Sequence, residues 1–524
     1  MTDIPDSVPV VIVGAGPTGV AAATTLAQYD IDCLVLDRWE GVYPQPRAVH
    51  LDDEIFRLIA GLGCADEFAA ISRPGLGLQL RDRNFHVLAQ FHRGASTHGY
   101  PQANMFDQPV FEAMLRRNLG RFPRAMVRGN AEVTGAVQAG PGKVLVTFTD
   151  RITGRQHRVE TTYLLGCDGA NSLIRTAIGT CMEDLKFHQR WLVVDVATTA
   201  DLNQWDGVHQ VCDPHRAATF MRIAATRYRW EFRLLAGETA NDYRTLSAVY
   251  PLIRPWVTDI ELGRLELLRV AEYTFRAQVA HRWRRGNMFI LGDAAHLTPP
   301  FIGQGLCAGL RDATNLAWKL AGVLSGGLPE SVLDSYEKER APHARYMIQF
   351  ARAMGFAMTA GGEAGNLLRR LVIPRLHLIP GIRRKILDST TPALNRSSMV
   401  FKTRRRRQLA GRLCPNAVLR DGRRLDAVIG HRFGVITTAA PTASQCEALE
   451  RRGAIAVTAH PGTELAHWLQ RGRAGAAVVR PDRTVLCASR DIDEILSKVP
   501  VFALSRPEGQ RAGRVMAPST CRSA

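Results

Sequence analysis

Long hydrophobic runs are absent from this chain of 524 residues. No apolar run approaches the length of about eighteen to twenty residues that a helix needs to cross a bilayer. A predicted strand begins almost at the N-terminus, without the basic segment and apolar stretch of a secretion signal. We therefore expect a cytoplasmic protein with no membrane partner.

Paired cysteines are also lacking. The 10 cysteines are scattered between Cys33 and Cys521, with no Cys-x-x-Cys pair and no metal-ligand spacing. Scattered cysteines are typical of free thiols in a reducing compartment. The pattern argues against a disulfide framework, thiol exchange and a bound metal.

Acidic residues are too few to balance the basic ones. The net charge is +18 and the pI is about 9.9, which can indicate a nucleic-acid partner. The arginines are dispersed, however, apart from one dense run at residues 402–407, and no nucleic-acid-binding module is recognisable. We interpret the charge as solvated surface and expect no nucleic-acid partner. The alternative is that the charge attracts small anionic ligands.

A glycine-rich turn is the most informative motif that is present. Residues 8–13 form an apolar predicted strand, and Gly14, Gly16 and Gly19 follow it where a helix begins. Gly14 permits a tight turn, Gly16 lets the backbone approach a pyrophosphate, and Gly19 lets the helix pack against the strand. The phosphates would face free N–H groups at the helix N-terminus. The arrangement predicts a dinucleotide-binding site.

An acidic residue stands where such a site needs one. A second predicted strand, residues 33–36, ends at Asp37, about twenty residues after the turn. Its carboxylate can accept both hydrogen bonds of an adenosine ribose, and it disfavours a 2′-phosphate there. Strand, turn, helix and acid in this order are more specific than a glycine motif alone.

Two later predicted strands also end beside a carboxylate. Residues 163–167 lead into Asp168, and residues 288–292 lead into Asp293, followed by the turn of residues 303–305 and another helix. Open α/β sheets bind ligands at the carboxyl ends of their strands, so these distant segments predict one shared site. No second complete glycine fingerprint follows, and a second dinucleotide domain is not expected.

In this order the motifs resemble a known family. The glycine fingerprint, then Cys-Asp-Gly-Ala-Asn-Ser-x-x-Arg, then Gly-Asp-Ala-Ala-His with Gly-Gln-Gly, are similar to the FAD-dependent aromatic hydroxylases built like para-hydroxybenzoate hydroxylase. Within that family the chain most resembles the 3-(3-hydroxyphenyl)propionate and 3-hydroxycinnamate hydroxylases. Residues 46–54, 191–195, 212–214 and 311–320 carry the closer likeness.

The resemblance implies FAD as the cofactor, with NADH or NADPH and O2 as co-substrates. It places the turn of residues 303–306 against the isoalloxazine ring, where amides at a helix N-terminus would stabilise a reduced, anionic flavin. It places Asp293 on the ribityl or pyrophosphate region, Arg47 on the pyrophosphate and Gln108 on the ribityl chain. The predicted cofactor-binding residues are Gly14, Gly16, Gly19, Asp37, Arg38, Arg47, Gln108, Asp168, Gly292, Asp293, Gly303, Gln304, Gly305 and Leu306.

The implied chemistry is electrophilic transfer of oxygen to a ring carbon of a phenol. Such a phenol must be drawn toward phenolate, which requires a base or a proton path to solvent. His50 and His296 are candidates by residue type, and Tyr273 or Tyr228 could relay a proton. Pro300 would stiffen the loop beside the reactive edge of the flavin. His50, His296 and Pro300 are therefore the predicted catalytic residues, and the choice among the bases stays open.

Strands in the middle of the chain are expected to roof a closed, apolar substrate pocket. They are residues 191–196, 208–211, 218–223 and 228–235. Trp230 and Phe232 share one face of their strand, and we interpret them as core packing. An acidic phenol would need a guanidinium, and the nearest candidates are Arg222, Arg229 and Arg233.

The predicted fold class is α/β, with a Rossmann-like FAD-binding domain interleaved with a mixed-sheet substrate domain and followed by a thioredoxin-like domain. The last unit is predicted from strands at 433–437 and 455–458, a helix at 444–451, a hairpin around 480–483 and a helix at 492–499. In the resembled family such tails are structural or assist dimer contacts, so a homodimer is possible. The predicted divisions are 1–180 with 275–360 (FAD binding), 181–274 (substrate), 361–410 (helical linker), 411–505 (thioredoxin-like, without Cys-x-x-Cys) and 506–524 (disordered tail).

Three functions remain open from sequence. The first is a monooxygenase that hydroxylates a small phenolic acid in aromatic catabolism, with 3-(3-hydroxyphenyl)propionate or 3-hydroxycinnamate as the expected substrate. The second is a tailoring hydroxylase of a polycyclic polyketide or antibiotic, which needs a wider pocket. The third is a flavin oxidoreductase without oxygen transfer.

Overall fold

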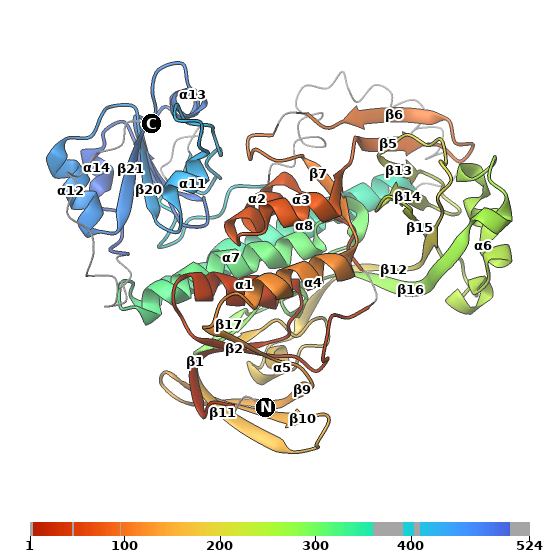
Figure 1. The fold of residues 1–524 in the computed structure, drawn as a ribbon, viewed down its shortest axis with the longest axis horizontal. Coiled ribbons are helices and arrows are strands. Elements are labelled where there is room, and N and C mark those ends of the chain that lie inside the picture. Colours follow the sequence, from red (N-terminus) through yellow and green to blue (C-terminus); the bar gives the residue numbers. More distant parts are fainter. Residues whose placement is uncertain (1–3, 45–46, 95, 360–390, 403–408, 503–524) are drawn as a thin grey trace.

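The computed structural model describes residues 4–44, 47–94, 96–359, 391–402 and 409–502 (Figure 1). Much of the predicted linker of residues 361–410 and the whole predicted tail of residues 506–524 lie outside these ranges. The predicted domain divisions otherwise stay a prediction. Within the described residues, no helix combines the length and hydrophobicity that crossing a bilayer requires.

The first sheet has a parallel centre built from the predicted apolar strands. β1 pairs in parallel with β2 on one side and with β11 on the other, and their inward residues are fully buried. The predicted strand at residues 33–36 coincides with β2. In the described chain the sheet consists of β17 (Arg284–Arg285), β18 (Met288–Ile290), β11 (Gln156–Gly166), β1 (Ser7–Val13), β2 (Cys33–Leu36) and β8 (Ala125–Arg128), with β10 (Lys143–Asp150) and β9 (Ala131–Gly140) paired outside this path.

Helices from distant parts of the chain pack over this sheet. α1 (Pro17–Gln28) begins directly after the glycine turn and lies beside α7 (Gly305–Leu324), as Figure 1 shows. Alanines at residues 21–23 are buried, so their small side chains permit the close approach. The surrounding helices are α2 (Asp53–Gly61), α3 (Ala65–Ile71), α4 (Gln108–Leu119), α5 (Leu173–Ala177) and α8 (Ser335–Thr359).

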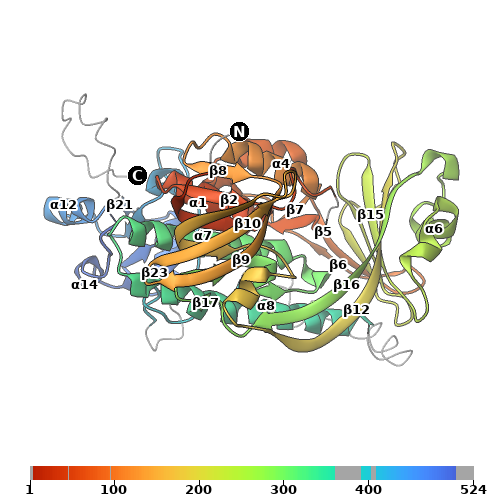
Figure 2. The same cartoon turned by 90° about the horizontal axis from the view of Figure 1, so that it is seen from below.

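A second sheet, of mixed direction, lies beside the first domain (Figure 2). The sheet includes β5 and β6, although the sequence-based division placed their residues with the first domain. Periodicity could not reveal this pairing, since β5 joins β13 only through the tertiary fold. The described order is β19 (His296–Leu297), β16 (Glu266–Ala280), β12 (Met182–Ala197), β15 (Arg227–Arg233), β14 (Ala218–Arg222), β13 (Val208–Val211), β5 (Gly77–Arg81) and β6 (Val87–His92).

Alternating side chains give this second sheet two different faces. Trp230 and Phe232 on β15 are buried in an apolar cluster with Trp256, near α6 (Leu246–Ile253), which confirms their predicted role in core packing. Glu231, which lies between them, points to the opposite face of the sheet. A small sheet of β3 (His50–Asp52), β7 (Ala103–Phe106) and β4 (Ser72–Pro74) also belongs to the described chain.

The C-terminal unit has the thioredoxin-like order β-α-β-α-β-β-α. β20 pairs in parallel with β21 and antiparallel with β22, and β22 forms the predicted hairpin with β23. The helix α13 was not predicted from sequence. Among the described cysteines, Cys446 departs from the expected free thiols because it is disulfide-bonded. The elements are β20 (Phe433–Thr437), α12 (Ala443–Arg451), β21 (Ala454–Thr458), α13 (Glu464–Arg471), β22 (Ala476–Val479), β23 (Val485–Ser489) and α14 (Asp493–Leu496), preceded by α11 (Leu425–Ile429).

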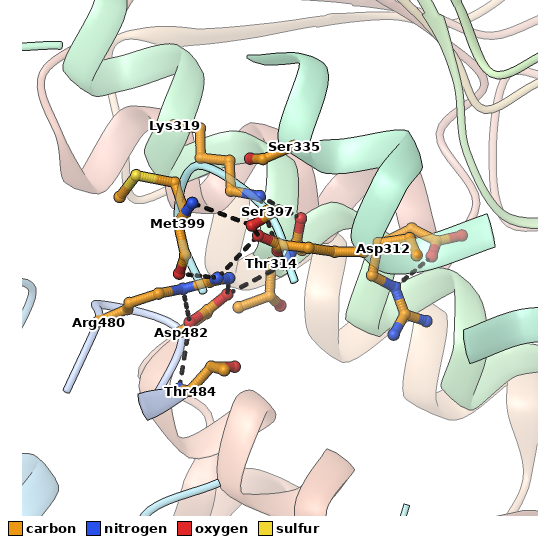
Figure 3. Close-up of polar contacts among 12 residues, drawn as sticks. Asp312, Thr314, Lys319, Ser335, Ser397, Met399, Arg480, Asp482 and Thr484 are labelled. Atoms are coloured by element: carbon orange, nitrogen blue, oxygen red, sulfur yellow. Dashed lines mark hydrogen bonds and ion pairs between the residues drawn. The ribbon is translucent and has the colours of Figure 1, made fainter. Parts of the chain in front are cut away.

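A buried polar network fastens this unit to the helices of the first domain (Figure 3). Arg480 donates a 3.0 Å hydrogen bond to Glu339 on α8, and Lys319 on α7 donates to the same carboxylate at 2.9 Å. Asp482 pairs with Arg480, and Asn315 bridges Glu339 and Asp482. Since these charged side chains are almost completely buried, the network fixes how the C-terminal unit sits on α7 and α8.

Candidate active site

The glycine turn has the geometry that the sequence predicts. Gly14 has a φ of +103°, and a Cβ there would lie 2.3 Å from the carbonyl oxygen of Cys167. A Cβ on Gly19 would lie 2.0 Å from the carbonyl oxygen of Gly14. A Cβ on Gly16, by contrast, would meet no protein atom within 4 Å. The turn therefore leaves open space beside Gly16, which fits the close approach of a pyrophosphate.

Asp37 closes the second strand beside this turn. Its Oδ2 accepts a 2.6 Å hydrogen bond from the backbone N–H of Ala15, and Arg116 lies 3.7 Å from the same oxygen. These contacts hold the carboxylate beside the glycine turn, and its predicted contact with an adenosine ribose stays a prediction. The neighbouring Arg38 is exposed, and its guanidinium lies 5.6 Å from the centre of the Trp39 ring.

Asp168 and Gly292 stand at the ends of the other two strands. The Oδ1 of Asp168 accepts from the Ser172 hydroxyl at 2.5 Å, and Oδ2 accepts from the N–H of Ile174 at 3.0 Å. The carboxylate of Asp168 thus organises the start of α5. Gly292 has a φ of +60°, and a Cβ there would lie 2.9 Å from the hydroxyl of Thr18 in α1. Both strand ends therefore lie beside the glycine turn and the start of α1.

Asp293, Arg47 and Gln108 gather at the entrance to the same region. The Nη1 of Arg47 lies 4.0 Å from Asp293, and both side chains are about half exposed. The Gln108 oxygen accepts from the backbone N–H groups of Arg47 and Ala48 at 2.7 and 2.6 Å. The Gln108 amide donates to Glu112 at 2.6 Å. Gln108 therefore shapes the Arg47 loop, and its predicted contact with the ribityl chain stays a prediction.

Gly303, Gln304 and Gly305 form the turn from which α7 begins. Gly303 has a φ of +62°, and a Cβ there would lie 2.8 Å from Nδ1 of His50. Gln304 donates a 2.8 Å hydrogen bond to Asp52 and accepts a 2.7 Å bond from Arg311. The buried side chains of Asp52 and Arg311 thus support the turn through Gln304. The backbone amides at the start of α7 lie beside the cavity.

A cavity of about 600 Å³ opens between this turn and the second sheet. Apolar and aromatic side chains from both domains line much of it, and these include Trp191, Val193, Met221, Phe275 and Phe301. The predicted residues that line it are Arg47, His50, Asp293, Pro300, Gly303, Gln304, Gly305 and Leu306, together with Tyr273.

His50 is the predicted base that reaches the cavity. Burial, together with the positive charge of Arg93, lowers the pKa of His50 to about 4, so the imidazole is neutral near pH 7. His50 also hydrogen-bonds the backbone of Gly303. A neutral imidazole in this position can support the turn and exchange hydrogen bonds with a ligand.

His296 lies elsewhere, which corrects its assignment as a base facing the substrate. Its Nε2 is 2.7 Å from the carboxylate of Asp312, it packs against Trp283, and it is not among the residues that line the cavity. Asp312 also accepts from Arg340 at 2.8 Å and from the N–H of Gly292 at 3.1 Å. The imidazole therefore belongs to a buried network beneath the strand end.

The other candidate side chains are also divided between the two faces of the second sheet. Tyr273 lines the cavity, and its hydroxyl hydrogen-bonds Arg269, whereas Tyr228 is buried in the apolar cluster on the far face. Arg229 is buried and paired with Asp195 through bonds of 2.7 and 2.9 Å. Neither Arg229 nor the other proposed acid-binding arginines, Arg222 and Arg233, lines the cavity.

Sequence reasoning missed three charged groups that do line the cavity, namely Arg93, Glu231 and Arg276. Arg93 follows β6, whose membership of the second sheet was not predicted. Alternation along β15 puts Glu231 on the face of the sheet opposite Trp230 and Phe232. Only the pairing of β15 with β12 and β14 shows that the face with Glu231 is a wall of the cavity.

Comparison with known proteins agrees with this fold. The sequence model described as FAD binding domain matches residues 7–351. A 3-(3-hydroxy-phenyl)propionate/3-hydroxycinnamic acid hydroxylase of Burkholderia cenocepacia is 34% identical over 435 residues, which are 82% of this chain and 78% of that protein. A similarly named hydroxylase 2 of Burkholderia vietnamiensis is 32% identical, covering 96% of this chain and 97% of that protein.

Two further proteins extend the comparison. A probable NADH-specific resorcinol 4-hydroxylase of Rhodococcus jostii is 35% identical over 67% of this chain and 66% of its own length. The flavin-dependent monooxygenase PieE, solved with FAD and substrate, has a TM-score of 0.77 at 22% identity, covering 95% of this chain and 99% of that chain.

Fold, turn and cavity together define a flavin-dependent aromatic monooxygenase. The chain belongs to the family of FAD-binding aromatic hydroxylases. FAD is accordingly its cofactor, as the sequence predicted, and the α/β class with a mixed-sheet domain and a small C-terminal sheet is confirmed.

Proposed function

We propose that this enzyme hydroxylates a small phenolic acid with O2 and NADH or NADPH, and that 3-(3-hydroxyphenyl)propionate or 3-hydroxycinnamate is the substrate. The observation that carries this proposal is the cavity of about 600 Å³, in which the turn before α7 faces an apolar sheet. Pockets for small molecules commonly measure roughly 300–1,000 Å³. This one must receive both the flavin ring and the substrate, which favours a single-ring substrate.

The residues that would hold FAD follow from the geometry. Gly16 would leave room for the pyrophosphate, Asp37 would hold the ribose, and the backbone amides of Gly303 and Gln304 would lie against the isoalloxazine ring. When bound, FAD supplies the hydride acceptance and oxygen activation that no amino-acid side chain provides.

The remaining task of the protein is to bind and orient the phenol and to exclude water. Trp191, Phe275 and Phe301 provide the apolar walls that water exclusion requires. Arg93 and Arg276 bring positive charge to the cavity lining, where a substrate carboxylate would find a counter-ion. NADH rather than NADPH is favoured by the name of the resorcinol hydroxylase relative.

A second candidate is a tailoring hydroxylase of a polycyclic natural product. It is supported by the similarity of fold to an aklavinone-11 hydroxylase solved with FAD and aklavinone, with a TM-score of 0.76 at 23% identity. The curated relatives named for phenylpropanoids are more similar in sequence, so we place this candidate second.

A substrate panel distinguishes these proposals. The purified FAD-loaded enzyme should oxidise NADH rapidly with 3-(3-hydroxyphenyl)propionate or 3-hydroxycinnamate, and mass spectrometry should find a product that has gained one oxygen atom. Resorcinol and a polycyclic phenol serve as comparisons. Product from the polycycle alone would overturn the first proposal. NADH oxidation with only peroxide formed would instead indicate an oxidoreductase without oxygen transfer.

We also propose a cytoplasmic location, where the reduced nicotinamide co-substrate is available. A homodimer stays a prediction, and analytical ultracentrifugation of the full chain tests it directly.

A further inference from the structure

Glu231 is a carboxylate that faces the cavity from the middle of the second sheet. It lies on β15 between Trp230 and Phe232, whose side chains point into the apolar cluster on the other face. Its neighbours across the sheet are Val193 on β12 and Thr219 on β14, and all three line the cavity. The position of Glu231 is thus fixed by the regular pleat and register of three paired strands.

The carboxylate of Glu231 has no hydrogen bond or ion pair with any residue that the structure describes. The adjacent polar side chains are engaged with one another, since Thr219 donates a 2.9 Å hydrogen bond to Gln210. Gln210 in turn donates to the carbonyl of Ala218 at 3.1 Å. The Glu231 side chain is half-buried on the cavity wall and its oxygens have no donor within the described part of the chain, so they are available to accept a hydrogen bond from a ligand.

The arginines on either side of Glu231 are bound to other partners. Arg229 makes two hydrogen bonds to Asp195, at 2.7 and 2.9 Å, and a third to the carbonyl of Arg47. Arg233 donates to the carbonyls of Pro214 and His215 at 2.5 and 2.7 Å. Glu231 therefore presents acceptor oxygens to the cavity, whereas these neighbouring guanidiniums do not line it.

We propose that Glu231 is the catalytic base that accepts the proton of the substrate's phenolic hydroxyl. This inference rests on the proposed function. The O–H bond of the phenol breaks, its electron pair stays on the phenolate oxygen, and the proton forms a new O–H bond on the Glu231 carboxylate. The phenolate is the more electron-rich ring, as electrophilic oxygen transfer requires.

The surroundings of Glu231 suit this role. Burial raises the pKa of Glu231 above its ordinary value, the positive charge of Arg229 opposes that rise, and Asp195 adds to it. A base whose pKa lies closer to the working pH transfers protons more effectively. The other titratable and charged groups around the cavity are His50, Arg47, Arg93, Tyr273, Arg276 and Asp293, with Arg269 and Arg233 behind the wall.

The direction of the pH dependence follows. Glu231 works as a base only when it is ionised, so kcat/KM should rise with pH through the raised pKa of this carboxyl. The variant Glu231→Gln keeps the size of the side chain but cannot take the proton. It should lose about a hundredfold or more in kcat/KM, together with this acidic limb of the profile. Reduction of FAD by NADH should be retained.

A binding measurement tests the same residue without turnover. The holoenzyme is titrated with 3-(3-hydroxyphenyl)propionate and its methyl ether, and also with phenol and anisole, while the flavin absorbance reports binding. A site built to accept a hydrogen bond from a hydroxyl discriminates strongly against an analogue that lacks it. Glu231→Gln should reduce this preference for the hydroxyl, because an amide can also donate to an ether.

Glu272→Gln is the matched control, since Glu272 is exposed on β16, pairs with Arg190 and lies outside the cavity lining. It should behave as the wild type. An unchanged pH profile and an unchanged hydroxyl preference in Glu231→Gln would overturn the inference, as would a wild type without hydroxyl preference. If the wild type prefers phenol to anisole but hydroxylates no phenolic acid, the proposed function fails while the binding role of Glu231 survives.

Discussion

At the scale of single residues, the glycines show how far backbone chemistry can be read from sequence. The positions of Gly14, Gly16 and Gly19 after an apolar strand predicted a turn, and the structure confirms it. Only the three-dimensional structure separates their roles, because a Cβ on Gly14 or Gly19 would meet protein backbone whereas Gly16 faces open space.

This separation gives a prediction about Gly16→Val. The substitution should leave the melting temperature of the apoprotein nearly unchanged, with a capping cost of at most about 1 kcal/mol, because a Cβ at this position meets no protein atom within 4 Å. It should weaken FAD binding by at least about tenfold, or 1.4 kcal/mol, by occupying space meant for the pyrophosphate. Differential scanning fluorimetry and FAD titration measure the two effects.

Gly14→Ala is the matched comparison. Its φ of +103° and the 2.3 Å approach to Cys167 mean that the added Cβ must displace backbone. We expect the apoprotein itself to lose at least about 1–3 kcal/mol of stability. Equal stability losses in the two variants would contradict the assignment of the open space to a ligand.

The residue scale is also where sequence reasoning was weakest. His50 and His296 were both candidates by residue type, yet the structure places His50 on the cavity and His296 beside Asp312. A histidine's role depends on partners that arrive from distant segments, and no local pattern encodes them. Arg229 was similarly misjudged, because its partner Asp195 lies on a neighbouring strand.

At the scale of elements, the strands were largely predictable and their pairing was not. Apolar runs located β2, β13 and β20 with their full bounds, since period and turn residues are local properties. The pairing of β5 with β13 joins segments more than a hundred residues apart, so the wall of the cavity could not be assembled from sequence.

The start of α7 depends on an equally non-local support. Arg311 lies between two buried carboxylates, 2.6 Å from Asp52 and 2.9 Å from Glu54, and also holds Gln304. Arg311→Met would leave both carboxylates without their cation, and we expect a loss of about 3–5 kcal/mol in the free energy of unfolding.

Urea denaturation measures this loss, and FAD titration should also report weaker binding because Gln304 is released from one partner. Arg244→Met, at an exposed arginine outside this network, serves as the control and should change stability by less than about 0.5 kcal/mol. A similar small change in Arg311→Met would show that the turn does not depend on this support.

At the scale of the whole molecule, buried charges join the C-terminal unit to the FAD-binding domain. One junction is the network in which Arg480 and Lys319, both labelled in Figure 3, bind the carboxylate of Glu339. A second joins Arg57 on α2 to Asp426 on α11 through two hydrogen bonds of 2.6 Å. The thioredoxin-like order was visible in sequence, but these contacts, which make the unit part of one molecule, were not.

The second junction makes the stability of the protein depend on pH. Burial alone would raise the pKa of Asp426, but the charges of Arg57 and Arg483 outweigh it and lower this pKa from 3.8 to about 2. A lowered pKa in the folded state gives stability that is fully present above pH 4 and is lost as the pH falls toward 2.

Asp426→Asn should therefore reduce stability by about 1.5–3 kcal/mol at pH 7 and by progressively less below pH 4. Chemical denaturation across pH 3–7 measures the difference between variant and wild type. Asp421→Asn removes an exposed ion pair with Arg423 from the same unit and should change stability far less than Asp426→Asn does. A pH-independent difference for Asp426→Asn would contradict this account of the junction.

The central claim is that segments far apart in the chain converge to hold FAD beside the cavity under α7. The most direct measurement is a titration of the apoprotein with FAD, followed by flavin absorbance, in the wild type and in Gly16→Val. The account predicts stoichiometric, saturable binding to the wild type and at least about tenfold weaker binding to the variant. A wild-type protein that stays colourless with excess FAD, or a variant that binds equally well, would contradict it.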